Sequence, residues 1–346
     1  MDSSTHSFPK ILVTGGAGFI GSHTVVSLIE AGFEPVIVDN FDNSEPSVLE
    51  GLRTILGREV TCYTVDCNDE AAMDEIFRKE ALHGVIHFAA YKAVGESVEK
   101  PLKYYRNNLG SLWTLLGLMH QHGVAHLVFS SSCTVYGQPE QLPVTELTPR
   151  LPAESPYGNT KAMGEDIIRD SVRAKMPVKA ISLRYFNPVG AHPSAVIGEL
   201  PRGVPSNLVP FLTQAAAGLR DKLTVFGDDY NTPDGSCIRD FIHVMDLADA
   251  HVQALRLLDQ QETSSFYDIF NVGTGQGVSV LELINTFEEA TGVKLNYIIG
   301  PRRPGDVEQI YANVDKANTV LGWEAKRSLS ESLSDAWRWQ QKLQAK

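Results

Sequence analysis

A tyrosine and a lysine four positions apart, together with a serine cluster upstream, are the residues of this sequence best suited to chemistry. Tyr157 and Lys161 are predicted to share one face of a helix, because residues i and i+4 are neighbours there. A free tyrosine titrates near about 10, and a nearby cation favours the phenolate, so the pair can accept a proton near neutral pH. Ser132, at the end of an apolar run, can relay that proton. We predict that these three residues are catalytic.

A glycine-rich turn near the start of the chain predicts a ligand site of a different kind. The apolar residues 10–14 lead into Gly-Gly-Ala-Gly-Phe-Ile-Gly, which ends at Gly21. A strand, a tight turn and a helix start in this order can hold a dinucleotide pyrophosphate on backbone N–H groups. Gly15 or Gly16 makes the turn in this interpretation, and Gly18 admits the phosphates. Gly21 lets the helix pack closely on the strand, and the pattern as a whole predicts an NAD-type cofactor.

An acidic residue after the second apolar run favours NAD over NADP. Residues 35–39 end at Asp39, whose carboxylate can accept hydrogen bonds from the adenosine ribose. Asn40 and Phe41 follow it, and neither is an arginine. A ribose phosphate would therefore meet a carboxylate without a guanidinium to neutralise it.

Short apolar runs that alternate with helical stretches predict the fold class. The runs cover residues 10–14, 35–39, 60–65, 84–89, 126–131 and 179–185. Strands of this kind are buried on both faces, which indicates a Rossmann-type, doubly wound parallel sheet of the α/β class. From about residue 187 the chain is rich in Pro, Gly and Asn, which predicts a smaller, mixed α/β substrate-binding domain. Leu329 to Lys346 is predicted to form a final amphipathic helix.

The predicted domains are therefore residues 1–186 for the cofactor and residues 187–346 for the substrate. A segment near residues 238–270 is expected to cross back to the first domain.

Composition excludes several classes of protein. The chain has 346 residues, of which 43% are hydrophobic, and this excludes disordered and fibrous proteins. Its formal net charge of −12 argues against binding to nucleic acid. It has no apolar run long enough to cross a bilayer, and its first residues do not resemble a signal peptide, so we expect a cytoplasmic protein. The four cysteines form no Cys-x-x-Cys pair, and His120 and His122 would point to different helix faces, so no metal site is predicted.

These motifs resemble the extended short-chain dehydrogenase/reductase family and, within it, the UDP-galactose 4-epimerases. The resemblance extends over essentially the whole chain, and its more specific segments begin at Phe88, Arg184, Arg239 and Arg302. The dehydratases of the family carry an Asp-Glu pair where this chain has Cys133-Thr134-Val135.

The resemblance implies a set of binding residues for NAD and another for the UDP-sugar. The implied NAD contacts are Gly15, Gly18, Phe19, Ile20, Gly21, Asp39, Asn40, Asn43, Asp66, Cys67, Phe88, Ala89, Lys92, Asn108, Tyr157, Lys161 and Tyr185. The implied UDP-sugar contacts are Lys92, Ser132, Tyr157, Asn187, Asn207, Leu208, Phe226, Arg239, Arg303, Asp306 and Ile310. Two arginines suit a diphosphate because each can form bidentate hydrogen bonds with it, and an aromatic ring suits the uracil.

The implied activity is reversible epimerisation of UDP-galactose and UDP-glucose at C4 of the hexose, as in galactose metabolism. It proceeds through a 4-keto sugar, with transient reduction of tightly bound NAD. Tyr157 is expected to remove the proton of the 4-hydroxyl group. The resemblance also implies a homodimer, formed by a helix around residues 101–121 and the helix that begins near Tyr157. An apolar stripe at Leu112, Leu115, Leu116 and Met119 offers little support, because such stripes more often face their own sheet.

Other functions remain open at this point. One is a related epimerase acting on UDP-N-acetylhexosamines or uronic acid derivatives, and another is a simple dehydrogenase that releases NADH. A third is a non-catalytic dinucleotide sensor on the same fold. Ile310 bears on the first, since this position is tyrosine in strict bacterial epimerases and cysteine in those that accept N-acetylated sugars. Because isoleucine is stiff and larger than cysteine, we expect N-acetylated substrates to be poor.

Overall fold

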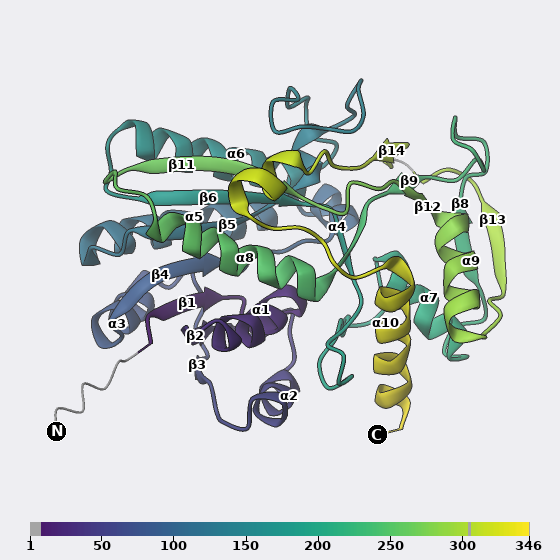
Figure 1. The fold of residues 1–346 in the computed structure, drawn as a ribbon, viewed down its shortest axis with the longest axis horizontal. Coiled ribbons are helices and arrows are strands. Elements are labelled where there is room, and N and C mark those ends of the chain that lie inside the picture. Colours follow the sequence, from purple (N-terminus) through teal and green to yellow (C-terminus); the bar gives the residue numbers. More distant parts are fainter. Residues whose placement is uncertain (1–7, 304–305, 346) are drawn as a thin grey trace.

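A parallel sheet of seven strands forms the centre of the molecule (Figure 1). The computed structural model describes residues 8–303 and 306–345. The strands are β1 (Lys10–Thr14), β2 (Glu34–Val38), β3 (Thr61–Tyr63), β4 (Leu82–His87), β5 (His126–Ser132), β6 (Lys179–Tyr185) and β11 (Phe266–Val272). Their order is β11-β6-β5-β4-β1-β2-β3, and every pair is parallel. The predicted fold class is confirmed, and β11 is a strand that was not among the predicted runs.

Helices cover both faces of this sheet. One face carries α1 (Phe19–Glu30), α2 (Ser47–Leu56) and α8 (Val244–Asp259), and the other carries α3 (Glu70–Lys79), α5 (Pro101–His122) and α6 (Pro156–Arg173). The short helix α4 (Val94–Glu99) precedes α5. All seven residues of β5 are buried, as expected for a strand between two helical layers.

Local sequence explains where the helices next to the sheet begin and end. The side chain of Ser155 accepts a hydrogen bond from the backbone N–H of Gly158, and Pro156 occupies the first turn of α6. Helix α5 likewise begins with Pro101 and ends before Gly123, whose φ of 69° closes the helix. These caps fix the position of Tyr157 in the first turn of α6.

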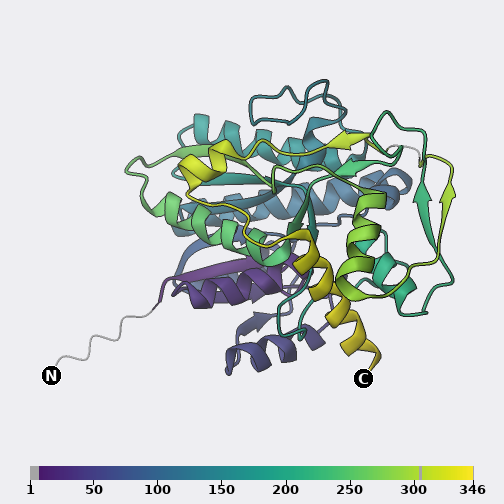
Figure 2. The ribbon, with the colours of Figure 1, turned by 45° about the vertical axis from the view of Figure 1, so that its right-hand side comes forward.

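A smaller group of elements lies beside the central sheet (Figure 2). Its helices are α7 (Leu208–Ala216), α9 (Val280–Thr291) and α10 (Leu329–Gln344), which share a hydrophobic core. Its short strands are β7 (Asn187–Val189) with β10 (Phe241–His243), β8 (Leu223–Phe226) with β13 (Tyr297–Gly300), and β9 (Ile238–Arg239) with β12 (Val278–Ser279) and β14 (Gln309–Ile310). Helix α10 corresponds to the predicted final helix and begins at the same residue, Leu329. Lys346 lies outside the described residues.

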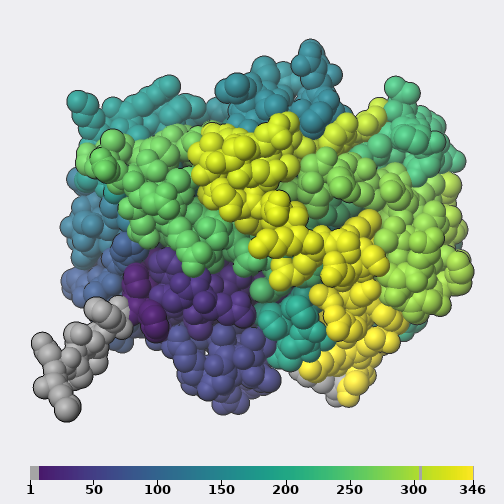
Figure 3. All heavy atoms as spheres, viewed as in Figure 1, coloured from purple at the N-terminus to yellow at the C-terminus, as the bar shows by residue number. Residues whose placement is uncertain are grey.

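The chain returns to the central sheet twice after residue 187. The first return consists of α8, which packs against α1, and β11, which pairs with β6. The second is the helical turn Ala317–Leu321, which with Trp323 joins the same hydrophobic core as α8. Figure 3 shows these late residues in yellow, lying across the face next to the green residues of α8. Only the first return was expected from the sequence.

The strand order reverses between β1 and β4, and in folds of this class ligands bind at the carboxyl ends of the strands at such a point. Among the described residues, we find no helix with the length and apolar character needed to cross a membrane.

Candidate active site

The structure brings the three predicted catalytic residues to the carboxyl end of β5. Ser132 ends this strand and caps the 3₁₀ helix Cys133–Tyr136, and Tyr157 lies in the first turn of α6. The ammonium of Lys161 donates a hydrogen bond of 2.6 Å to the carbonyl oxygen of Ser130. It lies 5.9 Å from the centre of the Tyr157 ring.

The protonation of this pair differs from the sequence-based expectation. Burial raises the pKa of Tyr157 to about 12, and a hydrogen bond with Ser132 opposes this rise. Burial also lowers the pKa of Lys161 to about 7. The expected lowering of the phenol pKa by Lys161 is not found, because the ammonium is hydrogen-bonded to the Ser130 carbonyl and is itself desolvated.

A buried ion pair is connected to this end of β5 by hydrogen bonds. Arg184 donates two hydrogen bonds to the carboxylate of Glu165, at 2.8 and 2.6 Å, and both side chains are almost fully buried. Ser131 donates to the same carboxylate at 2.6 Å, and Arg184 also donates to the hydroxyl of Tyr136 at 3.0 Å. The network joins β5, β6 and α6. Sequence reasoning gave no role to Glu165, because nothing local distinguishes it from a surface glutamate.

The glycine turn has the close contacts that its sequence predicts. Gly15 has a φ of +69°, and a Cβ there would lie 2.8 Å from the backbone nitrogen of Ala89. A Cβ on Gly21 would collide with the carbonyl oxygen of Gly15, so this glycine lets α1 pack against the turn. At Gly18 a Cβ would meet only the Gly15 oxygen, at 3.1 Å, which leaves the outer side of the turn open.

The start of α1 offers N–H groups to an anion. Gly18 is its N-cap, no side chain caps the helix, and its first turn has no acidic residue. The first N–H groups of a helix lack partners within it, and the helix dipole favours negative charge there. The open side of Gly18 and this uncapped helix start fit the pyrophosphate of NAD.

Asp39 has a structural role that the sequence did not predict. It accepts hydrogen bonds from the N–H of Ala17 at 3.0 Å, the N–H of Phe41 at 2.9 Å and the hydroxyl of Ser44 at 2.8 Å. The carboxylate therefore fastens the glycine turn to the end of β2. A carboxylate has about four acceptor positions, so a ribose hydroxyl would share it with this loop.

Other predicted NAD contacts lie at or near the carboxyl ends of the same strands. Asn40 donates to Asp66 at 3.1 Å, and Cys67 beside it is buried. The side-chain amide of Asn108 accepts a hydrogen bond from the N–H of Tyr91 at 2.9 Å and donates one to its carbonyl oxygen at 3.1 Å. Asn108 therefore orders the loop that carries Lys92. Further predicted contacts occupy the first turn of α1, the loops after β2 and β4, and the end of β6, and these are Phe19, Ile20, Asn43, Phe88, Ala89 and Tyr185.

Glu199 links predicted cofactor and substrate residues. Its carboxylate accepts hydrogen bonds from Lys92 at 3.2 Å and from the side chain of Asn207 at 2.8 Å. Asn207 precedes Leu208, the first residue of α7. Sequence reasoning missed Glu199, since Lys92 lies 107 residues before it in the chain.

The predicted UDP residues form a second cluster. The carboxylate of Asp306 accepts two hydrogen bonds from Arg303, at 3.0 and 2.7 Å, and lies 3.9 Å from Arg239. The guanidinium of Arg303 lies 5.5 Å from the ring centre of Phe226, which is 41% exposed. Two cations and an exposed ring thus lie together. Pro304 and Gly305 of the same motif lie outside the described residues.

Two further predicted residues lie in short strands of the smaller group of elements. Ile310 in β14 pairs with Arg239 and is 4% exposed, within a core that contains Cys133 and Phe186. Asn187 begins β7, where its N–H donates to the carbonyl of Asp240 at 3.0 Å.

Comparison with known proteins identifies the family of this chain. UDP-glucose 4-epimerase 2 of Arabidopsis thaliana is 51% identical over 333 residues, which are 95% of this chain and 94% of that protein. The chain belongs to the UDP-glucose 4-epimerase family. The crystal structure of the Bifidobacterium longum family member, in complex with NAD⁺ and UDP, superposes with a TM-score of 0.92 at 46% identity. The superposition covers 96% of this chain and 98% of that one. The Stenotrophomonas maltophila epimerase, with bound NAD and formylated UDP-arabinopyranose, gives 0.94 at 46% identity and covers 97% and 99%.

A broader family model, described as GDP-mannose 4,6 dehydratase, matches residues 12–336. This epimerase family member lacks the Asp-Glu pair expected of dehydratases at the end of β5. Cys133 and Thr134 occupy that place.

Proposed function

We propose that this chain interconverts UDP-glucose and UDP-galactose at C4 of the hexose, with Tyr157 as the group that exchanges a proton with the C4 hydroxyl. Membership of the epimerase family supports the reaction. The observation that supports the residue assignment is the meeting of Ser132, Tyr157 and Lys161 at the end of β5. Only β4 separates β5 from β1 and its glycine turn, which is two strand spacings, or about 10 Å.

The chemistry divides between the cofactor and the side chains. When bound, NAD would supply the two-electron acceptor for the C4 hydride and the donor that gives this hydride back. Tyr157 takes the hydroxyl proton, and Ser132 holds the same oxygen by a hydrogen bond. Lys161 supplies a cation that favours the phenolate once its ammonium turns from Ser130 toward the phenol. Each of these roles reverses when the hydrogen returns to the other face, so the net reaction is an isomerisation.

Retention of the reactive ketone depends on the UDP half of the substrate. Arg239 and Arg303 supply charge for the diphosphate, and Phe226 supplies an exposed ring for the uracil. Asp306 accepts hydrogen bonds from Arg303 and lies 3.9 Å from Arg239, so it holds the two guanidinium groups near each other. The hexose itself must stay loosely held, because it has to present both faces of C4 in turn.

We propose that the chain forms a homodimer through the outer faces of α5 and α6. Leu102, Trp113 and Met163 on these helices are 81%, 77% and 38% exposed. Leu102 and Trp113 are eleven residues apart, about three helical turns, so they share a face. The stripe at Leu112, Leu115, Leu116 and Met119 is buried against the sheet instead. Sedimentation should show a dimer that Trp113→Ser weakens, and a wild-type monomer at micromolar concentration would contradict the proposal.

We also propose a cytoplasmic location, and the structure bears on the alternative functions. All four cysteines are unpaired, which supports the proposed cytoplasmic location. The intact group of Ser132, Tyr157 and Lys161 disfavours a non-catalytic sensor.

The substitution Tyr157→Phe tests the residue assignment. It should lower turnover by roughly 10²–10⁴, the usual contribution of a positioned acid or base. Binding of UDP should remain, because the cluster of Arg239 and Arg303 is unchanged. Tyr105→Phe is the matched control, since it removes a hydroxyl that contacts Asn159 of the same helix at 2.7 Å. Equal turnover in Tyr157→Phe and the wild type would rule out the assigned role.

A further inference from the structure

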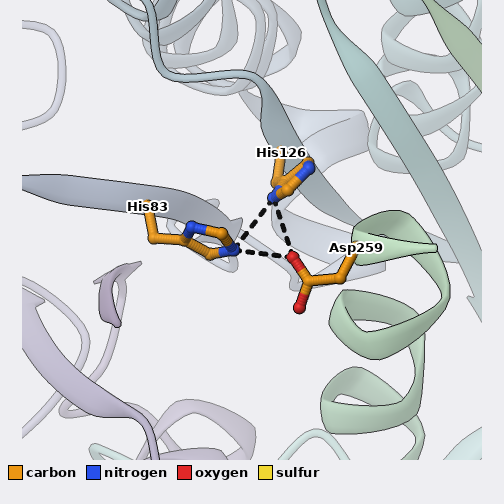
Figure 4. Close-up of side chains that lie close together, drawn as sticks. All are labelled: His83, His126 and Asp259. Atoms are coloured by element: carbon orange, nitrogen blue, oxygen red, sulfur yellow. Dashed lines mark hydrogen bonds and ion pairs between the residues drawn. The ribbon is translucent and has the colours of Figure 1, made fainter. Parts of the chain in front are cut away.

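Two histidines and an aspartate meet at the end of the central sheet that lies away from the active site (Figure 4). His83 belongs to β4, His126 is the first residue of β5, and Asp259 is the last residue of α8. Asp259 Oδ1 lies 2.7 Å from His83 Nε2 and 3.4 Å from His126 Nδ1, and the two nitrogens are 3.2 Å apart. In the part of the chain that the structure describes, this is the only such group of three potential metal ligands.

The three ligand atoms form a triangle close to one face of a tetrahedral metal site. Zinc binds imidazole nitrogen and carboxylate oxygen at about 2.0–2.1 Å, which separates tetrahedral ligand atoms by about 3.3 Å. The distances of 3.2 and 3.4 Å match this value, and only the 2.7 Å distance must lengthen. That adjustment is small for Asp259, whose side chain is 38% exposed at a helix end.

We propose that His83, His126 and Asp259 bind a divalent transition metal ion, with Zn²⁺ the best fit, and that water completes the site. Two imidazoles and one carboxylate suit zinc, and they do not suit magnesium, which prefers oxygen ligands. His83 and Asp259 are 36% and 38% exposed, so an ion can enter and a water can bind from the open side. The carboxyl end of α8 adds the negative end of a helix dipole.

The location assigns this ion a structural role. His126 and Ser132 are the two ends of β5, six residue steps or about 20 Å apart, so the ion would not touch the substrate. It would instead fasten the end of α8 to β4 and β5. Lys179 pairs with His126 in the sheet, and its positive charge would repel a metal ion. Its ammonium, however, donates a hydrogen bond to the carbonyl of Gln261 at 2.7 Å.

Calorimetric titration of Zn²⁺ into the full chain with its bound NAD, after treatment with a chelator, tests the proposal. We expect one equivalent bound with micromolar or tighter affinity, and no response to Mg²⁺. His83→Asn should weaken Zn²⁺ binding by more than about 100-fold, since even partners behind a metal ligand contribute 10–100-fold. Asp259→Asn, at an exposed helix end, should weaken it as well. Epimerase activity without Zn²⁺ should be the same in both variants as in the wild type.

The matched control is His122→Gln. His122 and Asp74 form another histidine–aspartate pair, at 2.6 Å, but without a second histidine. This variant should bind Zn²⁺ as the wild type does, and Zn²⁺ should raise the melting temperature of both by several degrees. Absence of the high-affinity equivalent in the wild type, or equal binding in wild type and His83→Asn, would show a hydrogen-bonded cluster only and overturn the proposal.

Discussion

Tyr157 and Lys161 show how far residue types and spacing can predict a site. The i, i+4 spacing and the serine at the end of a strand were sufficient to select the residues that the structure brings together. The spacing could not predict their protonation, because that depends on burial and on the Ser130 carbonyl, which comes from another element. Glu199 was missed for the same reason, since its partner Lys92 lies 107 residues away in the sequence and no local pattern pairs the two.

The lowered pKa of Lys161 predicts a pH dependence of stability. Folding lowers this pKa from 10.5 to about 7, so between these pH values the unfolded chain binds more protons than the folded protein. The contribution of Lys161 to the free energy of unfolding therefore rises with pH across this window and is lowest below pH 7. Urea unfolding of the wild type and Lys161→Met should show a stability difference that moves in favour of the wild type as the pH increases. A difference that is constant with pH would contradict the shifted pKa.

Ile310 carries a prediction about substrate range. Ile310→Cys should raise kcat/KM for UDP-N-acetylgalactosamine by about tenfold or more, the usual effect of a methylene that obstructs a pocket, and leave UDP-galactose nearly unaffected. Val144→Cys is a control for loosened packing, because Val144 is buried in the same hydrophobic cluster. If the unmodified protein uses both substrates equally well, Ile310 does not limit the pocket.

At the scale of elements, the apolar runs predicted six of the seven strands in the central sheet. The seventh strand, β11, was not predicted, because Asp268 and Asn271 interrupt its apolar residues. Its first four residues are also only partly buried. It is an edge strand, so one of its sides has no neighbouring strand to bury it. Asn271 is nevertheless buried, because its side chain accepts a hydrogen bond from Tyr136 at 2.6 Å.

The buried ion pair of Arg184 and Glu165 is expected to contribute to stability, because it connects β5, β6 and α6. Arg184→Met leaves the carboxylate of Glu165 buried without its main partner, which typically costs about 3–5 kcal/mol in the free energy of unfolding. Arg173→Met removes an exposed partner of Asp170, at 3.9 Å, and should change stability by less than about 0.5 kcal/mol. Chemical denaturation measures both. If both variants lose a similarly small free energy of unfolding, the buried ion pair does not stabilise the contact between these elements.

At the scale of the whole molecule, long-range contacts decide what the sequence could not predict. The second return to the central sheet places Trp323 in the same hydrophobic core as α8. No local sequence pattern predicts this contact. The group of His83, His126 and Asp259 likewise forms only when β4, β5 and α8 come together. By contrast, the glycine turn was predictable because its strand, turn and helix are consecutive in the sequence.

We infer that the protein catalyses a redox cycle in which its own NAD is never consumed. The most direct measurement is to incubate the freshly purified chain with UDP-galactose alone and to follow the formation of UDP-glucose without added NAD. We predict that UDP-glucose forms until the two sugars reach equilibrium, that the same mixture is reached from UDP-glucose, and that no NADH is released. If product forms only with a continuous external supply of NAD, or if NADH accumulates in step with product, the chain does not work as an epimerase with retained cofactor.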